Sequence, residues 1–152
     1  MTRRGLAAIV AVSFIALAGA GRTQGQVPSS ERVPLATVTV DALHPWIDAG
    51  LTVSKGERLV FEATGTIQWG SKPDQVAGPE GRGGKPGKVG PGGLIGRVGL
   101  TGKPFPIGNS RLPLAMPRDG KLLLGINDFI FKDNAGSFVV KVFEAGAPTL
   151  RP

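Results

Sequence analysis

A cluster of oxygen-bearing side chains lies in the segment GINDFIFKDNAGSF, residues 125–138. Asp128, Asp133 and Asn134 fall within one short connection between apolar stretches, with Asn127 beside them. Carboxylate and amide oxygens, together with backbone carbonyls, are the ligands that a hard cation such as Ca²⁺ takes. Two facing carboxylates repel each other, and a divalent ion between them replaces that repulsion with attraction. These residue types therefore indicate a calcium site.

The same segment also suits a purely structural turn. Asp and Asn side chains commonly accept hydrogen bonds from backbone N–H groups in connections between strands, and the spacing alone leaves this interpretation open. An EF-hand loop is excluded, because the D-x-D-x-D-G pattern is missing and Lys132 stands where a ligand would be. Two roles are also open for Phe129 and Phe131, which could belong to the core or to a binding surface.

Residue types suited to catalysis are scarce. The sequence has no Cys and no Tyr, and its one histidine, His44, precedes Pro45 near a predicted strand edge. A packed or surface histidine is the expected role there. A glycosidase needs two carboxylates about 5 Å or about 6.5–9.5 Å apart. Asp128 and Asp133 could meet that separation, but no third group is present to raise the pKa of one of them, as a general acid requires. We expect no enzymatic activity.

The elements that position these residues are predicted to be β-strands. Period-two alternation begins with ATVTV at 36–40, bounded by Pro34 and Asp41. Residues 46–53 are predicted as a short bent strand pair, followed by a turn at 54–56. Further strands are predicted at 58–68, 93–100, 120–126 and 136–143. About eight short strands between Gly/Pro turns predict an all-β fold, a small jelly-roll or galactose-binding-like β-sandwich.

A glycine stands at every third position from 78 to 102. Collagen needs this period together with imino acids at the other positions, which Pro fills only rarely here. Leu94, Val98 and Leu100 instead follow a period of two, as in a half-buried strand. We therefore predict a flexible loop over 71–92 that leads into a strand. A P-loop is excluded, because Gly87-Lys88 is followed by Val89 and not by Ser or Thr.

The N-terminal segment has the features of a secretory signal. Arg3 and Arg4 precede an apolar run over 6–17, which ends in the small residues Ala18-Gly19-Ala20. The run is shorter than the roughly 20 residues that cross a bilayer, so we expect no stable membrane anchor and a secreted or periplasmic protein. The predicted organisation is a signal peptide at 1–20, a flexible leader at 21–33, one sandwich domain at 34–144 and a disordered tail at 145–152.

The charge and the cysteine content limit the classes of binding partner that we expect and the ways in which the domain can be stabilised. The net charge of +7 falls to +5 once Arg3 and Arg4 leave with the signal peptide. Without cysteines, an exported domain depends on its core or on a metal ion and not on disulfides. Much of the excess positive charge lies in the stretch 72–103, which has no aromatic residue to stack on bases. We expect a solvated basic surface and no nucleic-acid partner.

Several segments together resemble a known family. GINDFIFKDNAGSF, with WIDAGLTVSKGERLVFEATGTIQWG, AGPEG and GGLIGRVG, resembles the LecA-type (PA-IL) calcium-dependent galactose-binding lectins over roughly residues 34–143. The N-D…D-N-x-G-S-F pattern is the most specific part, whereas W-x-D-x-G is common to several carbohydrate-binding sandwiches. The resemblance implies a jelly-roll sandwich with a single Ca²⁺ at one end, completed by two sugar hydroxyls.

The resemblance also implies the calcium ligands. Asp128 would be the acidic side-chain ligand, and Asp133 with Asn134 matches the family's adjacent pair of Asn ligands, with Asp replacing the first. The remaining ligands would be backbone carbonyls, one from Trp69 and one from within 129–132, with Phe131 or Ile130 as the candidates.

The sequence departs from the family at two places. The connection between Asp128 and Asp133 is two residues shorter than in the galactose-binding member. That member's sugar-contacting His and Gln fall in the stretch matching 71–92, which has no His and offers Gln75 as its one amide. The predicted sugar contacts are Asp128, Asp133, Asn134 and Gln75.

The sequence thus predicts a secreted, calcium-dependent carbohydrate-binding module, with a galactose-like sugar as one candidate ligand. A single site of this kind would bind weakly, so useful binding would need several sites, as in a homo-oligomer. The alternative is a non-catalytic structural module that binds protein or cell wall and no free sugar.

Overall fold

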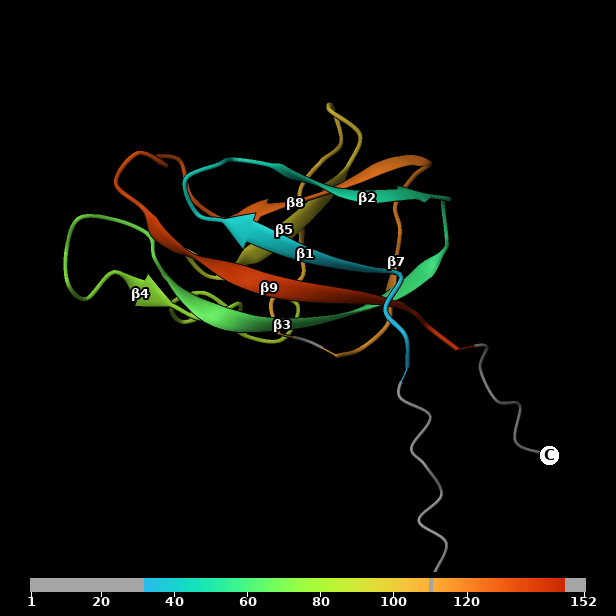
Figure 1. Ribbon diagram of the computed structural model, residues 1–152, viewed down its shortest axis with the longest axis horizontal. Coiled ribbons are helices and arrows are strands. Elements are labelled where there is room, and N and C mark those ends of the chain that lie inside the picture. Colours follow the sequence, from blue (N-terminus) through green and yellow to red (C-terminus); the bar gives the residue numbers. More distant parts are fainter. Residues whose placement is uncertain (1–31, 110, 147–152) are drawn as a thin grey trace, which may run out of the picture. The chain divides into compact units, whose positions relative to one another are not determined.

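Figure 1 shows the computed structural model, which describes residues 32–109 and 111–146. Every regular element in these residues is a strand, and the nine strands form two antiparallel sheets. The predicted all-β sandwich is therefore confirmed. Within the described part there is no helix that could span a membrane. The predicted signal peptide, most of the leader and most of the tail lie outside the described residues.

The first sheet is built around the two longest strands. Its order is β1-β9-β3-β4, with the short β7 also paired to β3. The long β3–β9 ladder runs from Leu59↔Glu144 to Gln68↔Ala135, and β1 pairs with the other edge of β9 as far as Asp41↔Ser137. Its strands are β1 (Ala36–Asp41), β3 (Arg58–Gln68), β4 (Val76–Ala77), β7 (Leu114–Ala115) and β9 (Ala135–Glu144).

The second sheet has the order β2-β8-β5-β6. Strand β8 lies at its centre and pairs with β2 from Ile47↔Leu124 and with β5 from Leu94↔Ile126. Its strands are β2 (Ile47–Val53), β5 (Leu94–Val98), β6 (Phe105–Pro106) and β8 (Gly120–Ile126).

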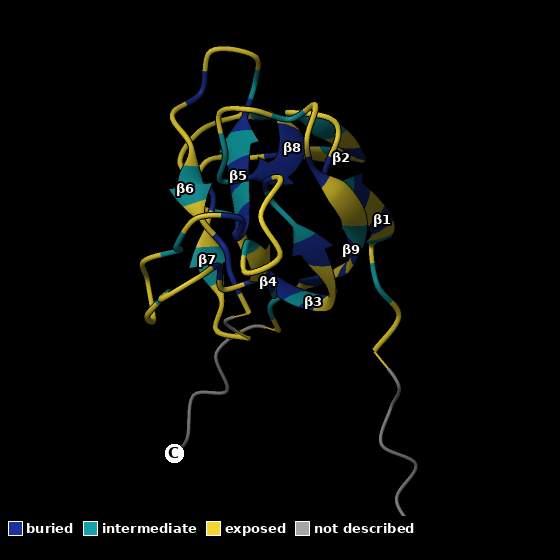
Figure 2. Cartoon of the chain, turned by 90° about the vertical axis from the view of Figure 1, so that its left-hand side faces the viewer, coloured by how far each residue is buried: buried dark blue, intermediate teal, exposed yellow. Residues whose placement is uncertain are grey.

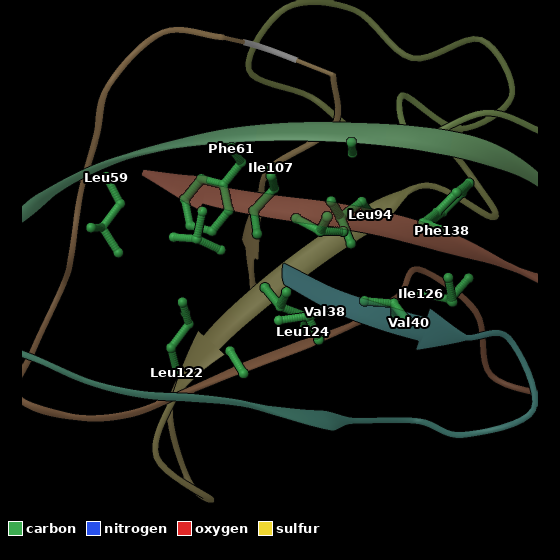
Figure 3. Packing of buried hydrophobic residues seen from close by; sticks show 14 of the residues in the cluster. Val38, Val40, Leu59, Phe61, Leu94, Ile107, Leu122, Leu124, Ile126 and Phe138 are labelled. Carbon is green, nitrogen blue, oxygen red and sulfur yellow. The ribbon is translucent and has the colours of Figure 1, made fainter. Parts of the chain in front are cut away.

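The hydrophobic core lies between the two sheets. Alternate residues of each strand point inward, so Leu59 and Phe61 of β3 meet Leu122 and Leu124 of β8 in one buried cluster (Figure 3). Figure 2 shows that burial is concentrated in the strands, whereas the connections are mostly exposed. Burying side chains of this size contributes about 1.5–3 kcal/mol each, so the core holds the strand ends in place without disulfides.

Two local expectations are wrong. Residues 46–53 do not form a strand pair, because 47–53 is one strand, β2, whose bend is a shift of register against β8 between Asp48 and Thr52. Leu100 does not continue the inward face of β5. That strand ends at Val98, the chain turns at Gly99 with a φ of 76°, and Leu100 is 81% exposed.

The segment with a glycine at every third position, residues 78–102, which we call the glycine-rich stretch, is part of the sandwich. The predicted strand over 93–100 is β5, and the predicted loop over 71–92 contains the two-residue strand β4 and an antiparallel bridge between Lys85 and Lys88. Close backbone packing explains some of its glycines. A methyl group on Gly90 would lie 2.1 Å from the carbonyl oxygen of Arg82. The three-residue period therefore serves a folded loop and not a triple helix.

One end of the sandwich gathers the residues singled out in the sequence. Strands β1, β3 and β8 end there, and β9 begins there. The connection from β8 to β9, residues 127–134, passes from one sheet to the other at this end, at the left of Figure 1. We call residues 127–134 the acidic connection.

Candidate functional site

Asn134 anchors the acidic connection. It is 6% exposed and is the one buried polar or charged residue among those that the structure describes. Its Nδ2 donates to the carbonyl of Ala42 at 3.0 Å and to Oδ2 of Asp128 at 2.9 Å. Its Oδ1 is buried and has no hydrogen-bond partner in the described structure. An orphaned buried acceptor is unusual and unfavourable, because the group has lost its water and gained nothing in return.

Asp128 lies two residues after the end of β8 and is half-buried. Its Oδ1 accepts the N–H of Phe129 at 2.7 Å, and its Oδ2 accepts Nδ2 of Asn134. The carboxylate is therefore held in one orientation by two donors from its own connection. The prediction that Asp128 and Asn134 share one site agrees with this contact, and their role as metal ligands stays a prediction.

Asp133 is exposed and precedes Asn134 in a turn that the N–H of Asn134 closes onto the carbonyl of Phe131 at 3.1 Å. Neither Asp128 nor Asp133 forms an ion pair with any described residue, so Lys132 does not neutralise them. No group of three His, Cys, Asp or Glu side chains gathers in the described residues. A cation here would therefore depend on two carboxylates supplemented by amide and carbonyl oxygens.

Trp69 is brought to this end of the sandwich by β3. The last β3–β9 pair is Gln68↔Ala135. Trp69, which follows β3, and Asn134, which precedes β9, are therefore the next residues beyond the paired ends of these strands. The Trp69 indole packs against Gly92, where an added methyl group would lie 2.3 Å from Cδ1, and its Nε1 is buried without a partner in the described structure. The backbone of Trp69 thus follows the ladder pair next to Asn134, and its role as a carbonyl ligand stays a prediction.

The aromatic and aliphatic residues of the acidic connection differ in exposure. Phe131 is half-buried and offers its carbonyl to Asn134, whereas Phe129 is 95% exposed and Ile130 is 56% exposed. Of the two roles left open for the phenylalanines, core or surface, the structure places Phe129 at the surface and leaves Phe131 partly buried. Phe129 is not a core residue.

Gln75 lies in the loop that follows Trp69. Its carbonyl accepts the N–H of Trp69 at 2.8 Å, which places the two residues side by side. Its side chain lies against Gly70, and its Oε1 accepts the N–H of Lys72 at 2.8 Å. The amide thus braces its own loop, and its predicted contact with sugar stays a prediction.

Two features of the site were missed by the sequence analysis. The carbonyl of Ala42 fixes Asn134, and no side-chain pattern could have indicated a backbone atom. Asn127 joins the acidic connection to the glycine-rich stretch, because its Nδ2 donates to the carbonyls of Val89 at 3.3 Å and Gly90 at 3.1 Å. Its main chain also exchanges hydrogen bonds with Gly92 and Gly93.

Comparison with known proteins finds a similarity among solved structures. No protein-family model and no curated protein matches the sequence. Among solved structures, the chain is similar to the N-terminal domain of EclA, described as a PllA-like lectin, with a TM-score of 0.63 and 28% sequence identity. The match covers 74% of this chain and 98% of the lectin domain.

The similarity spans nearly all of that lectin domain and includes the fold described above. It supports a likeness to lectin domains. Galactose specificity, calcium dependence and secretion stay predictions. The chain is therefore a small β-sandwich that resembles a lectin domain and gathers oxygen donors at one end.

Proposed function

We propose that this protein is a non-catalytic, calcium-dependent lectin-like module, exported from the cell, which binds carbohydrate at the acidic connection. The single observation that carries the proposal is the buried Oδ1 of Asn134, which lacks a partner in the described structure. It lies in a side chain whose nitrogen contacts the Asp128 carboxylate at 2.9 Å. The similarity to a PllA-like lectin gives this arrangement its biological context.

The donors fit calcium in chemical type. They are Asp128, Asp133 and Asn134 through side-chain oxygens, and Trp69 and Phe131 through carbonyls. All are oxygen atoms, and the two carboxylates match the charge of a divalent ion. Calcium takes six to eight oxygen ligands, so five protein donors leave positions for hydroxyl groups. When bound, the ion would supply a positive centre that attracts two sugar hydroxyls and satisfies the Asn134 oxygen.

The protein's own residues would then orient the sugar. Asp128 and Asp133 can accept hydrogen bonds from hydroxyl groups, and each charge-assisted bond contributes about 1.5–3 kcal/mol. Phe129, which is 95% exposed on the same connection, offers apolar surface to the C–H face of a sugar ring. A galactose-like sugar is the first candidate, and Gln75, which lies beside Trp69, is the candidate amide contact.

A glycan array tests the function directly. The protein is applied with millimolar calcium and again with excess chelator. We expect calcium-dependent binding to one class of glycans, lost in Asp128→Ala and kept in the control Asp119→Ala. Asp119 also accepts a backbone N–H, that of Lys55 at 2.7 Å, but it precedes the other end of β8.

The alternative, a module that binds protein or cell wall, makes a different prediction. The exposed Phe129 and Ile130 would also suit a protein surface. Calcium binding in solution together with an array that stays empty would support this alternative. Glycan binding that persists in chelator would contradict the calcium part of the proposal and leave the lectin part standing.

A further inference from the structure

We propose that the loop formed by residues 80–91, here called the glycine-rich hairpin, carries an anion-binding site made by Lys85, Lys88 and Arg82. These three cations line one pocket of about 340 Å³ together with the backbone of the hairpin. The site is separate from the acidic connection but is attached to it through Asn127.

A tight turn fixes the two lysines. Lys85 and Lys88 exchange backbone hydrogen bonds of 2.9 and 2.8 Å across Pro86 and Gly87. Gly87 has a φ of 74°, which suits the position after proline in a type II turn. Residues that exchange both bonds lie directly opposite, with Cα atoms about 5.5 Å apart and side chains on the same face. The turn therefore starts both lysine side chains from the same face of the hairpin, where both line one pocket.

This pair of like charges is not compensated within the described residues. Neither Lys85 nor Lys88 forms an ion pair there. Glu80 lines a neighbouring pocket with Lys85, but its carboxylate lies beside Gly78, where a methyl group would be 3.1 Å from Oε1. Like charges directly opposite each other are unfavourable. An anionic group between the two lysines would relieve that repulsion.

Arg82 completes the pocket and is itself held in place. Its Nη1 contacts Oδ2 of Asp74 at 3.1 Å, and its backbone N–H donates to the carbonyl of Pro91 at 2.9 Å. A guanidinium group has five N–H donors, so one carboxylate does not exhaust it. The N–H of Gly90 donates to the carbonyl of Glu80 at 3.0 Å, which closes the base of the hairpin. The three cations are thus attached to a backbone that hydrogen bonds hold in one conformation.

The position of the hairpin indicates the class of ligand. Asn127, which precedes Asp128, donates to the carbonyls of Val89 and Gly90, so the hairpin backbone is attached to the start of the acidic connection. An acidic glycan, carrying sulfate or carboxylate, could occupy both sites at once. The hairpin has no aromatic residue to stack on bases, which disfavours single-stranded nucleic acid. The anion site stands on its own geometry, whereas its assignment to a glycan rests on the proposed function.

The test compares two double variants that lose the same charge. Lys85→Gln/Lys88→Gln removes the pair, and Lys103→Gln/Lys141→Gln removes two exposed lysines elsewhere. The probes are inorganic sulfate, galactose, galactose 6-sulfate and galacturonic acid, each titrated at constant ionic strength with calcium and with chelator. Binding is followed by NMR, from the backbone amide signals of Lys85, Gly87 and Lys88.

Sulfate should shift these signals in calcium and in chelator alike. We expect Lys85→Gln/Lys88→Gln to weaken sulfate binding about fivefold to tenfold, as for two exposed charge contacts, and the control to change it little. Galactose 6-sulfate or galacturonic acid should bind more tightly than galactose by a similar factor when calcium is present. A preference between the two acidic sugars would identify the anionic group.

Other results would overturn the inference. Equal losses in both double variants would mean that net charge alone attracts the anion. No shift of the hairpin signals with sulfate would mean that no such site exists. Tight binding of a DNA duplex through the same lysines would replace the glycan by nucleic acid. Sulfate binding in a protein that binds none of these sugars would uphold the anion site and contradict its assignment to a galactose-type acidic glycan, whereas an empty glycan array would contradict the lectin function itself.

Discussion

The acidic connection and the glycine-rich hairpin are joined through Asn127, but their polar groups are satisfied differently. The hairpin is closed by backbone hydrogen bonds, such as those between Lys85 and Lys88, and its three cations are exposed. The acidic connection buries Asn134, whose Oδ1 is left without a partner in the described structure. The acidic connection therefore contains a buried polar atom that no described residue satisfies, and the proposed calcium ion would satisfy it.

This difference separates the proposed calcium site, in the acidic connection, from the hairpin, which we do not expect to bind calcium. If it is correct, changes in the acidic connection will alter the response to calcium, and changes in the hairpin will not. Each prediction below tests one side of this comparison.

The largest effect is expected from Asn134→Ala. The substitution leaves the buried carbonyl of Ala42 without its donor and frees the Asp128 carboxylate. We expect the metal-free protein to lose about 2–4 kcal/mol of unfolding free energy and the stabilisation by calcium to disappear. Urea unfolding with and without calcium measures both. The control Asn109→Ala, at an exposed position, should change stability by less than about 0.5 kcal/mol.

Asn134→Asp separates the two roles of this residue. It keeps an oxygen but loses the donor to Ala42, so the metal-free protein should still be destabilised while calcium restores it. A protein that calcium stabilises equally with Asn, Asp or Ala at position 134 would show that the residue only supports the turn.

Asp128→Ala should act chiefly on calcium binding. The metal-free protein loses two hydrogen bonds on a half-buried carboxylate, a cost of about 1–2 kcal/mol. At a calcium concentration 100 times the dissociation constant, the wild type should gain about 2.7 kcal/mol, and the variant nothing. Thermal unfolding against calcium concentration measures the gain. Retention of the gain in Asp128→Ala, or its loss in Asp119→Ala, would exclude the acidic connection as the site.

Gly87→Ala tests whether the glycine-rich hairpin takes part in the response to calcium. No atom lies within 4 Å of the added methyl group, so the cost, about 1 kcal/mol, comes from the φ of 74° alone. Gly99→Ala is the matched control, with a φ of 76° and equal space. Both variants should lose similar stability and keep the full effect of calcium. A weaker calcium effect in Gly87→Ala alone would show that the hairpin takes part in that site.

The smallest effect is expected at Asp48, a carboxylate outside both loops. The N–H of Gly50 at 2.8 Å lowers its pKa most, burial opposes this, and Lys121 at 3.5 Å lowers it further. A lowered pKa in the folded protein adds stability above the ordinary carboxyl pKa, and this is lost as the pH falls through the folded value. Asp48→Asn should therefore flatten the acid side of the stability profile. An equally steep acid side would contradict it, and calcium should stabilise both proteins equally.

The strands were predictable where the side-chain pattern is regular. Apolar residues at every second position, such as Leu59 and Phe61 or Leu122 and Leu124, belong to the core, and the strands over 58–68 and 120–126 have the predicted bounds. The register shift in β2 was not predictable, because it depends on pairing with β8. The two-residue strands β4, β6 and β7 are too short to show any period.

The candidate site was predictable only in its side chains. Asp128 and Asn134 stand out by type and spacing, and the structure places them in contact. The support beneath them consists of backbone atoms, such as the Ala42 carbonyl, and of glycine packing. Backbone contacts between distant segments leave no local pattern in a sequence. The pairing of Lys85 with Lys88 could have been inferred from Lys-Pro-Gly-Lys, a strong turn signal.

Calorimetric titration of the metal-free protein with calcium tests the central claim most directly. We predict one bound ion per chain in the wild type, a matching rise in melting temperature, and neither effect in Asp128→Ala or Asn134→Ala. Heat and melting temperature that stay unchanged in the wild type up to millimolar calcium would contradict the account.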